Sequence, residues 1–433
     1  MATSSRGVLA ISLLLAIPLA LPPSAPHDVY AQPKTTDHLI QFYQSRVARD
    51  PDDFFNYNKL GGAYIQKARE TGDVTYYELA EKALKKSLEL VPDGPMATSA
   101  TASLAAVHLA KHRFADALTS AQKALALGSG DLSPQAIVGD AYLEIGEYEK
   151  ASLAYSKMLA LSGPLHPYSR LSYLQFLRGD PPGAIEHMRR AVATAIEGNA
   201  PPENLAWSRV QLGELFFQIG EVAKAEAAYQ DALTTYPRYH RALAGLGKVR
   251  AAQQKHQDAI ALYQKALDVI PLPEYAAALG DVYTKIGRAG DAKRQYRLVE
   301  YIGYVNTLNR TIYNRELALF YADHDIMLKE ALDLAQKELE VRRDIYTHDV
   351  LGWALYKNGK LLEARAAMTD ALRLGTRDAR LFFHAGMIHR SLGDTEKARE
   401  YLLRALSTNP HFHVLQADVA RRALQELGVG GGR

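Results

Sequence analysis

The feature that most constrains the fold is a small residue, usually preceded by a large apolar one, that recurs along the whole chain. It occurs at Gly61, Ala105, Gly139, Ser172, Gly213, Gly247, Gly280, Ala318, Gly352 and Gly386. Six of the nine intervals between these positions are 33 or 34 residues. A fixed period of this length is typical of a helix–turn–helix repeat. The sequence therefore predicts an all-α array of about ten helix pairs.

A second column supports this register. Alanine follows the small residue by twelve positions in eight repeats, and Ala80 and Ala331 take the equivalent place in the other two. A small residue in the first helix and an alanine in the second allow the two backbones to approach closely. We therefore expect both columns to lie in the contact between the paired helices.

These residues resemble the tetratricopeptide repeat family, of an exported bacterial type. The fifth repeat is the closest match, through Leu212-Gly213, Phe216, Gly220, Ala225, Tyr229, Ala232 and Pro237. The resemblance implies a right-handed superhelical solenoid whose concave face, lined chiefly by first helices, holds peptides or partner proteins. It implies nothing specific about activity.

The order of segments along the chain predicts its domains. We expect a signal peptide at 1–31, repeats one to four at 32–196, a Pro/Gly break at 197–203 and repeats five to ten at 204–410. Residues 411–433 are expected to form a capping helix, Val414 to Leu427, and a flexible tail. A capping helix is needed because the last repeat would otherwise expose its apolar face.

The first thirty residues differ from the rest. Arg6 precedes the apolar run Gly7 to Leu21, and Val29-Tyr30-Ala31 ends the segment with small residues at signal-peptidase positions. The run is shorter than the ~20 residues that cross a bilayer. We therefore expect cleavage near Ala31 and a soluble protein in the periplasm or outside the cell. Retention of the segment as a membrane anchor is the alternative.

Composition excludes several classes of protein. Among 433 residues there is no cysteine, which excludes disulfides, thiolate metal sites and cysteine nucleophiles. The chain has 51 Lys and Arg against 48 Asp and Glu, a formal net charge of +3. This small charge gives no indication of nucleic-acid binding, which requires a concentrated basic face.

Signals for catalysis or metal binding are weak. His384/His389 and His411/His413 lack the spacing of a zinc motif. Asp323, Asp325 and Glu330 lack the glycine and the remaining oxygens of a calcium loop. The repeats leave no stretch long enough for a separate catalytic domain. We therefore expect no enzyme activity, no metal and no cofactor.

The candidate binding residues lie at outward positions of the first helices. The richest group is in the last two repeats, and a second group is in the fourth and fifth. The first group is Asp349, Trp353, Tyr356, Phe383, Met387 and Arg390; the second is Tyr173, Phe176, Trp207 and Phe217. Aromatic and arginine side chains are typical interface anchors. The alternative for each of them is contact between neighbouring repeats.

Two functions remain open from the sequence. The favoured one is a non-catalytic scaffold that binds protein or peptide partners on the concave face after export. The alternative is an accessory or regulatory subunit of a cell-envelope enzyme or transporter. In either case the expected partners are proteins, with contact to a membrane only through an uncleaved leader.

Overall fold

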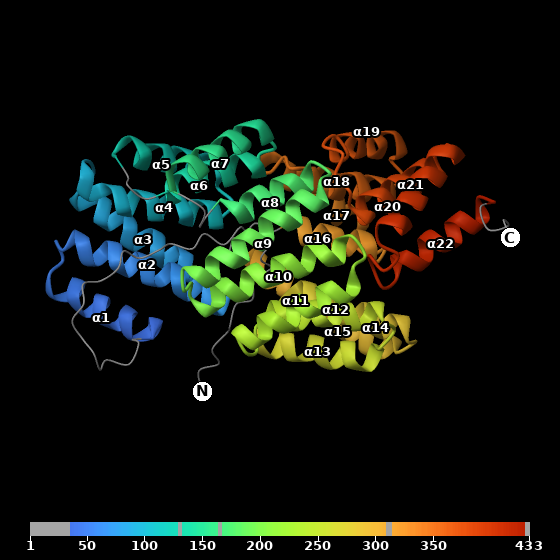
Figure 1. The fold of residues 1–433 in the computed structure, drawn as a ribbon, viewed down its shortest axis with the longest axis horizontal. Helices are drawn as coiled ribbons and strands as arrows, with labels where there is room; N and C mark the ends of the chain where they lie inside the picture. Colours follow the sequence, from blue (N-terminus) through green and yellow to red (C-terminus); the bar gives the residue numbers. More distant parts are fainter. Residues whose placement is uncertain (1–34, 129–131, 163–166, 309–313, 429–433) are drawn as a thin grey trace. The chain divides into compact units, whose positions relative to one another are not determined.

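The computed structural model describes residues 35–128, 132–162, 167–308 and 314–428, and within these ranges the chain is helical (Figure 1). They hold 22 α-helices and one short 3-10 helix, and no strand. The predicted signal peptide and the last residues of the predicted tail lie outside them. The chain forms two compact units, an N-terminal unit at Met1–Gly163 and a C-terminal unit at Pro164–Arg433.

The N-terminal unit holds one single helix followed by three helix pairs. α1 packs against α2, the first helix of the first pair. The bounds are α1 Thr36–Arg49, α2 Phe54–Thr71, α3 Thr75–Leu90, η1 Pro95–Ala97, α4 Thr98–Ala110, α5 Phe114–Ala126, α6 Ser133–Glu144 and α7 Tyr148–Ser162.

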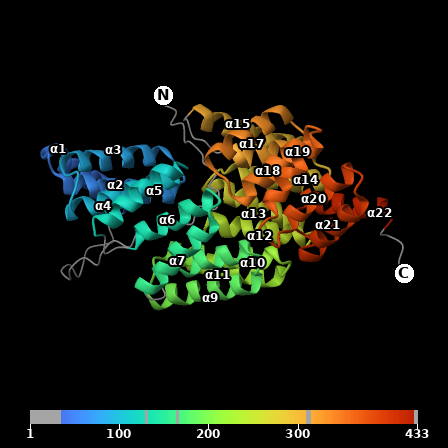
Figure 2. The same cartoon turned by 90° about the horizontal axis from the view of Figure 1, so that it is seen from above.

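The C-terminal unit holds seven helix pairs and a closing helix. The pairs are α8 Tyr168–Leu177 with α9 Pro181–Glu197, α10 Pro202–Gln218 with α11 Val222–Thr235, α12 His240–Ala252 with α13 His256–Val269, α14 Pro273–Lys285 with α15 Ala289–Leu308, α16 Asn314–Asp323 with α17 Leu328–Val341, α18 Ile345–Lys357 with α19 Leu361–Ala371, and α20 Ala379–Ser391 with α21 Thr395–Thr408. The closing helix is α22, Gln416–Glu426. Figure 2 shows it in red beside α20 and α21, where the sequence predicts a cap.

The two predicted columns do lie in the contacts between paired helices. All ten alanines of the second column are buried, and nine of them are fully covered. A Cβ atom added at Gly61 would lie 2.6 Å from Leu84 of the partner helix, and one added at Gly213 would lie 2.7 Å from Tyr229. Such distances cannot be accommodated without a shift of the neighbour. The predicted all-α array of about ten helix pairs is confirmed.

The ends of the helices follow from local chemistry. The carboxylates of Asp180, Asp344 and Asp378 accept hydrogen bonds from backbone N–H groups at the starts of α9, α18 and α20. These bonds satisfy donors that a helix leaves unpaired at its N-terminus. Five glycines in turns between paired helices all have a positive φ, which favours glycine. They are Gly146, Gly220, Gly287, Gly359 and Gly393.

The structure divides the chain at a different place from the Pro/Gly break expected at 197–203. α9 ends at Glu197 and α10 begins at Pro202, and the two helices pack against each other. The proline-rich segment is therefore a tight turn between two repeats, because Pro202 is well placed at a helix start. The boundary between the compact units falls one repeat earlier, at 163/164, so the fourth repeat belongs with the later ones.

Within the C-terminal unit, turns far apart in the sequence meet. Thr376, before α20, donates a hydrogen bond to the carbonyl oxygen of Leu177, at the end of α8 and 199 residues away. Asn409 Nδ2, after α21, donates a bond of 2.7 Å to the carbonyl oxygen of Phe217 in α10, 192 residues away. Helices from the two ends of this unit are therefore tied together by buried hydrogen bonds.

Candidate functional site

Three helix pairs contain the same hydrogen bond between the second helix and the first. In each, a second-helix tyrosine donates to the carboxylate that directly follows the small residue of the first helix. Tyr155 donates to Asp140 at 2.9 Å, Tyr229 to Glu214 at 2.8 Å and Tyr296 to Asp281 at 2.8 Å. Charged acceptors give stronger hydrogen bonds than neutral ones. The array therefore holds acidic groups at fixed places along its first helices.

The glycine of each pair makes this geometry possible. The tyrosine ring lies directly over Gly139, Gly213 or Gly280, where an added Cβ would overlap ring atoms. The ring can therefore cross the first helix and bring its hydroxyl to the carboxylate on the next residue. A glycine column that was expected only to allow close helix contact also positions a polar group.

Asp281 of α14 is the centre of the largest polar cluster of this kind. His324 Nε2 lies 2.7 Å from Asp281 Oδ1, and His413 Nε2 lies 3.3 Å from Oδ2. Burial alone would raise the pKa of Asp281, but the hydrogen bonds from the two histidines outweigh burial and hold this pKa well below its usual range. Asp281 is therefore ionised although its side chain is almost fully covered.

His324 is arranged to carry a positive charge. Its Nδ1 lies 2.7 Å from the carbonyl oxygen of Phe320, so both ring nitrogens face acceptors. Only the protonated ring can donate from both nitrogens. Burial would lower the pKa of His324, but the hydrogen bond to Asp281 raises this pKa above its ordinary value.

His413 belongs to residues 409–418, which we call the C-terminal segment. This segment leaves α21 and contacts three first helices of the C-terminal unit. Besides the bond from Asn409 to Phe217, Gln416 Nε2 donates to Asp323 Oδ1 at 2.7 Å, and Asp418 pairs with Lys285. The acidic groups of α14 and α16 are therefore in contact with the end of the chain.

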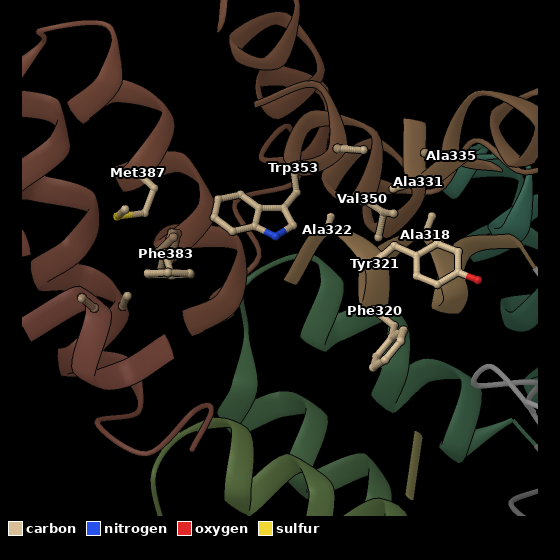
Figure 3. Packing of buried hydrophobic residues seen from close by; sticks show 14 of the residues in the cluster. Ala318, Phe320, Tyr321, Ala322, Ala331, Ala335, Val350, Trp353, Phe383 and Met387 are labelled. Atoms are coloured by element: carbon tan, nitrogen blue, oxygen red, sulfur yellow. The ribbon is translucent and has the colours of Figure 1, made fainter. Parts of the chain in front are cut away.

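Most of the first predicted group is buried. Trp353, Phe383 and Met387 are 3%, 1% and 8% exposed, and Asp349 is fully covered. Figure 3 shows the Trp353 ring between Phe383 and Met387 on one side and Val350 and Ala322 on the other. These side chains fill the contact between the last repeats, which is the alternative that the sequence left open. Their role in partner binding stays a prediction.

Polar contacts fix the same residues. Trp353 Nε1 donates to Asp323 at 2.8 Å, and its ring stacks on His384 with centroids 4.1 Å apart. His384 Nδ1 lies 2.8 Å from Asp349, and both side chains are fully covered. The Trp353 indole is therefore held by packing and by hydrogen bonding.

Two members of the first group are partly exposed. The Tyr356 ring stacks on Trp353 with centroids 4.8 Å apart. Arg390 pairs with Glu426 of the capping helix. Both residues therefore retain surface that a partner could reach.

The second predicted group is similarly placed. Phe176, Trp207 and Phe217 are buried, and Tyr173 is partly exposed. Lys248 Nζ lies 5.2 Å from the centre of the Phe217 ring and 2.7 Å from Glu214 Oε2. The exposed part of this region is thus the Glu214–Lys248 pair together with part of Tyr173, and not the three buried aromatic side chains.

The important contacts were only partly visible in the sequence. Glu214, Lys248 and Asp281 lie on first helices, but the residue types typical of interfaces favour aromatic side chains and arginine over them. Asp323 and His413 were considered only as members of incomplete metal motifs. Their roles depend on contacts between residues far apart in the chain, for which a sequence pattern gives no signal.

The described parts of the chain contain no group of three or more His, Asp and Glu side chains that could hold a metal ion. Nor does any helix in these parts have the length and apolar character needed to span a membrane.

Comparison with known proteins places part of the chain in a family. The family model described as tetratricopeptide repeat matches residues 210–277 and 350–411. These ranges cover α11 to α13 and α19 to α21 together with neighbouring first helices.

One curated relative and two solved structures are similar to the chain. Human protein O-mannosyl-transferase TMTC1 is 27% identical over 233 residues, which are 50% of this chain and 25% of that protein. The chain thus spans about a quarter of the length of this relative. Yeast Tom70 covers 91% of this chain, with 93% of its own chain matched, 15% identity and a TM-score of 0.41. MamA covers 39% of this chain, with 96% of its own matched, 23% identity and a TM-score of 0.32.

The TM-scores are below 0.5, so the two structural likenesses add nothing to the functional argument. The family match and the geometry of the helix pairs agree with each other. In both matched ranges the small residue and the buried alanine occupy the places seen throughout the array. Residues 210–277 and 350–411 thus match the tetratricopeptide repeat family, in the same all-α array of helix pairs as the rest of the described chain.

Proposed function

We propose that this protein is a non-catalytic scaffold that binds a protein or peptide along the first helices of its C-terminal unit. The observation that carries the proposal is the set of first-helix charges held in place by neighbouring helices. Tyr229 and Lys248 both contact Glu214, and Tyr296 and His324 both contact Asp281. Repeat arrays of this kind present extended surfaces for binding.

Fixed charges favour recognition because they are ordered before the partner arrives. A side chain that is already held by a hydrogen bond loses less conformational entropy on binding. Charges at fixed spacing also select partners by complementarity and penalise like charge. The Glu214–Lys248 pair is about one third exposed, so a partner can reach both groups.

A pull-down with matched variants tests this proposal. The bait is the full chain, and the variants are Glu214→Gln and Lys248→Met. The control is Glu221→Gln with Lys224→Met, because Glu221 and Lys224 form an exposed ion pair on the α11 side of the same repeat. We expect Glu214→Gln and Lys248→Met to lose a partner that the wild type and the control variant retain.

Equal capture by all variants would place binding elsewhere on the molecule. The composition of the captured material separates the two functions that the sequence left open. Several unrelated proteins support a scaffold. One stoichiometric enzyme or transporter supports an accessory subunit of a cell-envelope complex.

We also propose that the protein is exported to the periplasm or the cell exterior. The support is the apolar run Gly7 to Leu21 with the Val29-Tyr30-Ala31 ending. Mass spectrometry of protein from the native source should find a mature N-terminus at Gln32. Detection of the intact Met1 terminus on membrane-bound protein would contradict this proposal.

A further inference from the structure

The C-terminal segment makes contacts that capping does not require. A cap needs to cover the last repeat only. The α22 helix does this with apolar side chains such as Ala420, Ala423 and Leu424, which are buried in the hydrophobic cluster that also contains Trp353 and Phe383. The polar residues at the start of the same helix contact helices much earlier in the unit. Gln416 contacts Asp323 at the end of α16, and Asp418 contacts Lys285 at the end of α14.

The acidic groups contacted by the segment belong to the first-helix surface for which we propose partner binding. His413 and Gln416 are three residues apart and contact Asp281 and Asp323, respectively. The segment therefore presents two hydrogen-bond donors to two carboxylates on neighbouring first helices. This is the contact pattern expected of a bound peptide, made here by the protein itself.

The segment satisfies this surface incompletely. Gln416 Oε1 is buried and has no hydrogen-bond partner among the described residues. A buried acceptor without a partner destabilises the state that buries it. The amide also brings no charge to Asp323, whereas a basic side chain at this place would form a charge-assisted hydrogen bond. A peptide with a basic residue in place of Gln416 would therefore fit these carboxylates better.

Release of the segment need not remove the cap. The contacts of His413, Gln416 and Asp418 are polar, and the Lys285–Asp418 pair is partly exposed and therefore weak. The apolar side of α22 is held separately, by α20 and α21. The contacts with α14 and α16 can consequently break while Asn409 and Phe412 hold the start of the segment against Phe217 and Phe383 and α22 keeps the last repeat covered.

We propose that residues 409–418 are an intramolecular ligand that occupies Asp281 and Asp323 until a peptide with two basic or amide donors about three residues apart displaces it. This inference rests on the proposed function, because it names the part of the first-helix surface that is blocked and the chemistry of the partner that unblocks it.

A fluorescent peptide binding assay tests the inference directly. The probe is a synthetic peptide of residues 409–419 that carries Gln416→Lys. The proteins are the full chain and its double variant His413→Ala/Gln416→Ala, which removes both donors of the segment. We expect the probe to bind the double variant at least tenfold more tightly than the wild type, because the segment at high effective concentration competes only in the wild type.

Two further variants serve as controls. Gln425→Ala removes the same amide from an exposed position of α22 and should leave probe binding at the wild-type level. Adding Asp281→Asn and Asp323→Asn to the double variant should abolish its gain in affinity for the probe. Circular dichroism shows whether each variant is folded, and the single variant Gln416→Ala, with a smaller expected gain, replaces the double variant if the latter unfolds.

The outcomes are distinct from those of the pull-down. Equal affinity for the wild type and the folded double variant would overturn the inference, and so would absence of binding to both. If capture still depends on Glu214 and Lys248, the proposed function stands without intramolecular occupation. If capture is independent of them while the probe binds as expected, binding is restricted to α14 and α16.

Discussion

Gly179, in the turn between α8 and α9, lies directly against the carbonyl oxygen of Gly375, in the turn between α19 and α20. Gly179 has a φ of +75°, and a Cβ atom there would overlap that oxygen. Beside this contact, Thr376 donates a buried hydrogen bond to Leu177. Within the C-terminal unit, the turn of the first helix pair therefore contacts the turn that precedes the last helix pair, although the two turns are far apart in sequence.

This contact predicts different effects for two similar glycine substitutions. Gly179→Ala and Gly359→Ala both place alanine at a positive φ, which costs about 1 kcal/mol. Only Gly179→Ala also forces a clash, since an added Cβ at Gly359 meets no atom within 4 Å. We expect Gly179→Ala to lower the free energy of unfolding by ~1–3 kcal/mol more than Gly359→Ala, as overpacking does. Denaturant unfolding of both variants measures the difference, and equal losses would show that the turns do not meet in solution.

Tyr296→Phe should weaken the cluster around Asp281. The substitution removes the hydroxyl that donates at 2.8 Å and leaves the ring over Gly280 in place. A hydrogen bond to a charged acceptor contributes about 1.5–3 kcal/mol, and the two histidines of the cluster replace only part of it. Thermal and denaturant unfolding should show this loss. Tyr304→Phe is the control on the same helix, because Tyr304 is 62% exposed and should tolerate the change.

The pair of Asp281 and His324 predicts a pH dependence of stability. The pKa of His324 is raised in the folded protein, so its contribution is complete below the ordinary pKa of 6.5 and is lost as the pH rises through the folded value. The pKa of Asp281 is lowered, so its contribution is present above 3.8 and is lost as the pH falls through the folded value. The other groups facing Asp281 are Tyr296 and His413. Tyr296 donates to Oδ1 but carries no charge, and His413 contacts Oδ2, so neither replaces a charged His324 at Oδ1.

The measurement compares the wild type with His324→Gln by denaturant unfolding at several pH values. The difference in unfolding free energy should be larger at about pH 5.5 than at about pH 9, because the charged ring is lost with rising pH. His187→Gln provides a control of opposite sign, since burial lowers the pKa of His187 and its protonation therefore destabilises the fold at low pH. A constant difference for His324→Gln would mean that folding does not change the pKa of His324.

Trp353→Ala separates contact between repeats from partner binding. The side chain is 3% exposed, stacks on His384 and donates to Asp323. Truncation of a buried tryptophan typically costs ~3–5 kcal/mol, so we expect a clear fall in melting temperature. Affinity for a captured partner is measured on the protein that stays folded. Intact affinity would assign Trp353 to the core, and a separate loss of affinity would support the binding role predicted from the sequence.

The repeating unit could be predicted from the amino-acid sequence alone. Its period of 33 or 34 residues, the ten alanines and the turn glycines predicted the helix pairs, their number and the cap, because each of these features acts between neighbouring segments. Close contact requires a residue without a large side chain wherever it occurs, so the requirement appears as a column. The α1 helix and the boundary at 163/164 have no such column and were not predicted.

Which surfaces of the repeats contact one another could not be predicted, because it depends on the tertiary structure. A first-helix aromatic residue such as Trp353 can face a partner or a neighbouring repeat, and its position in the repeat is the same in both cases. In the structure the Trp353 ring packs against Phe383 and His384 of the next repeat. The contacts of Asn409 with Phe217 and of His413 with Asp281 depend on the small rotation that each repeat adds to the next. That rotation accumulates over several repeats before the two contacting residues come together, and a local pattern of residues does not indicate the total rotation.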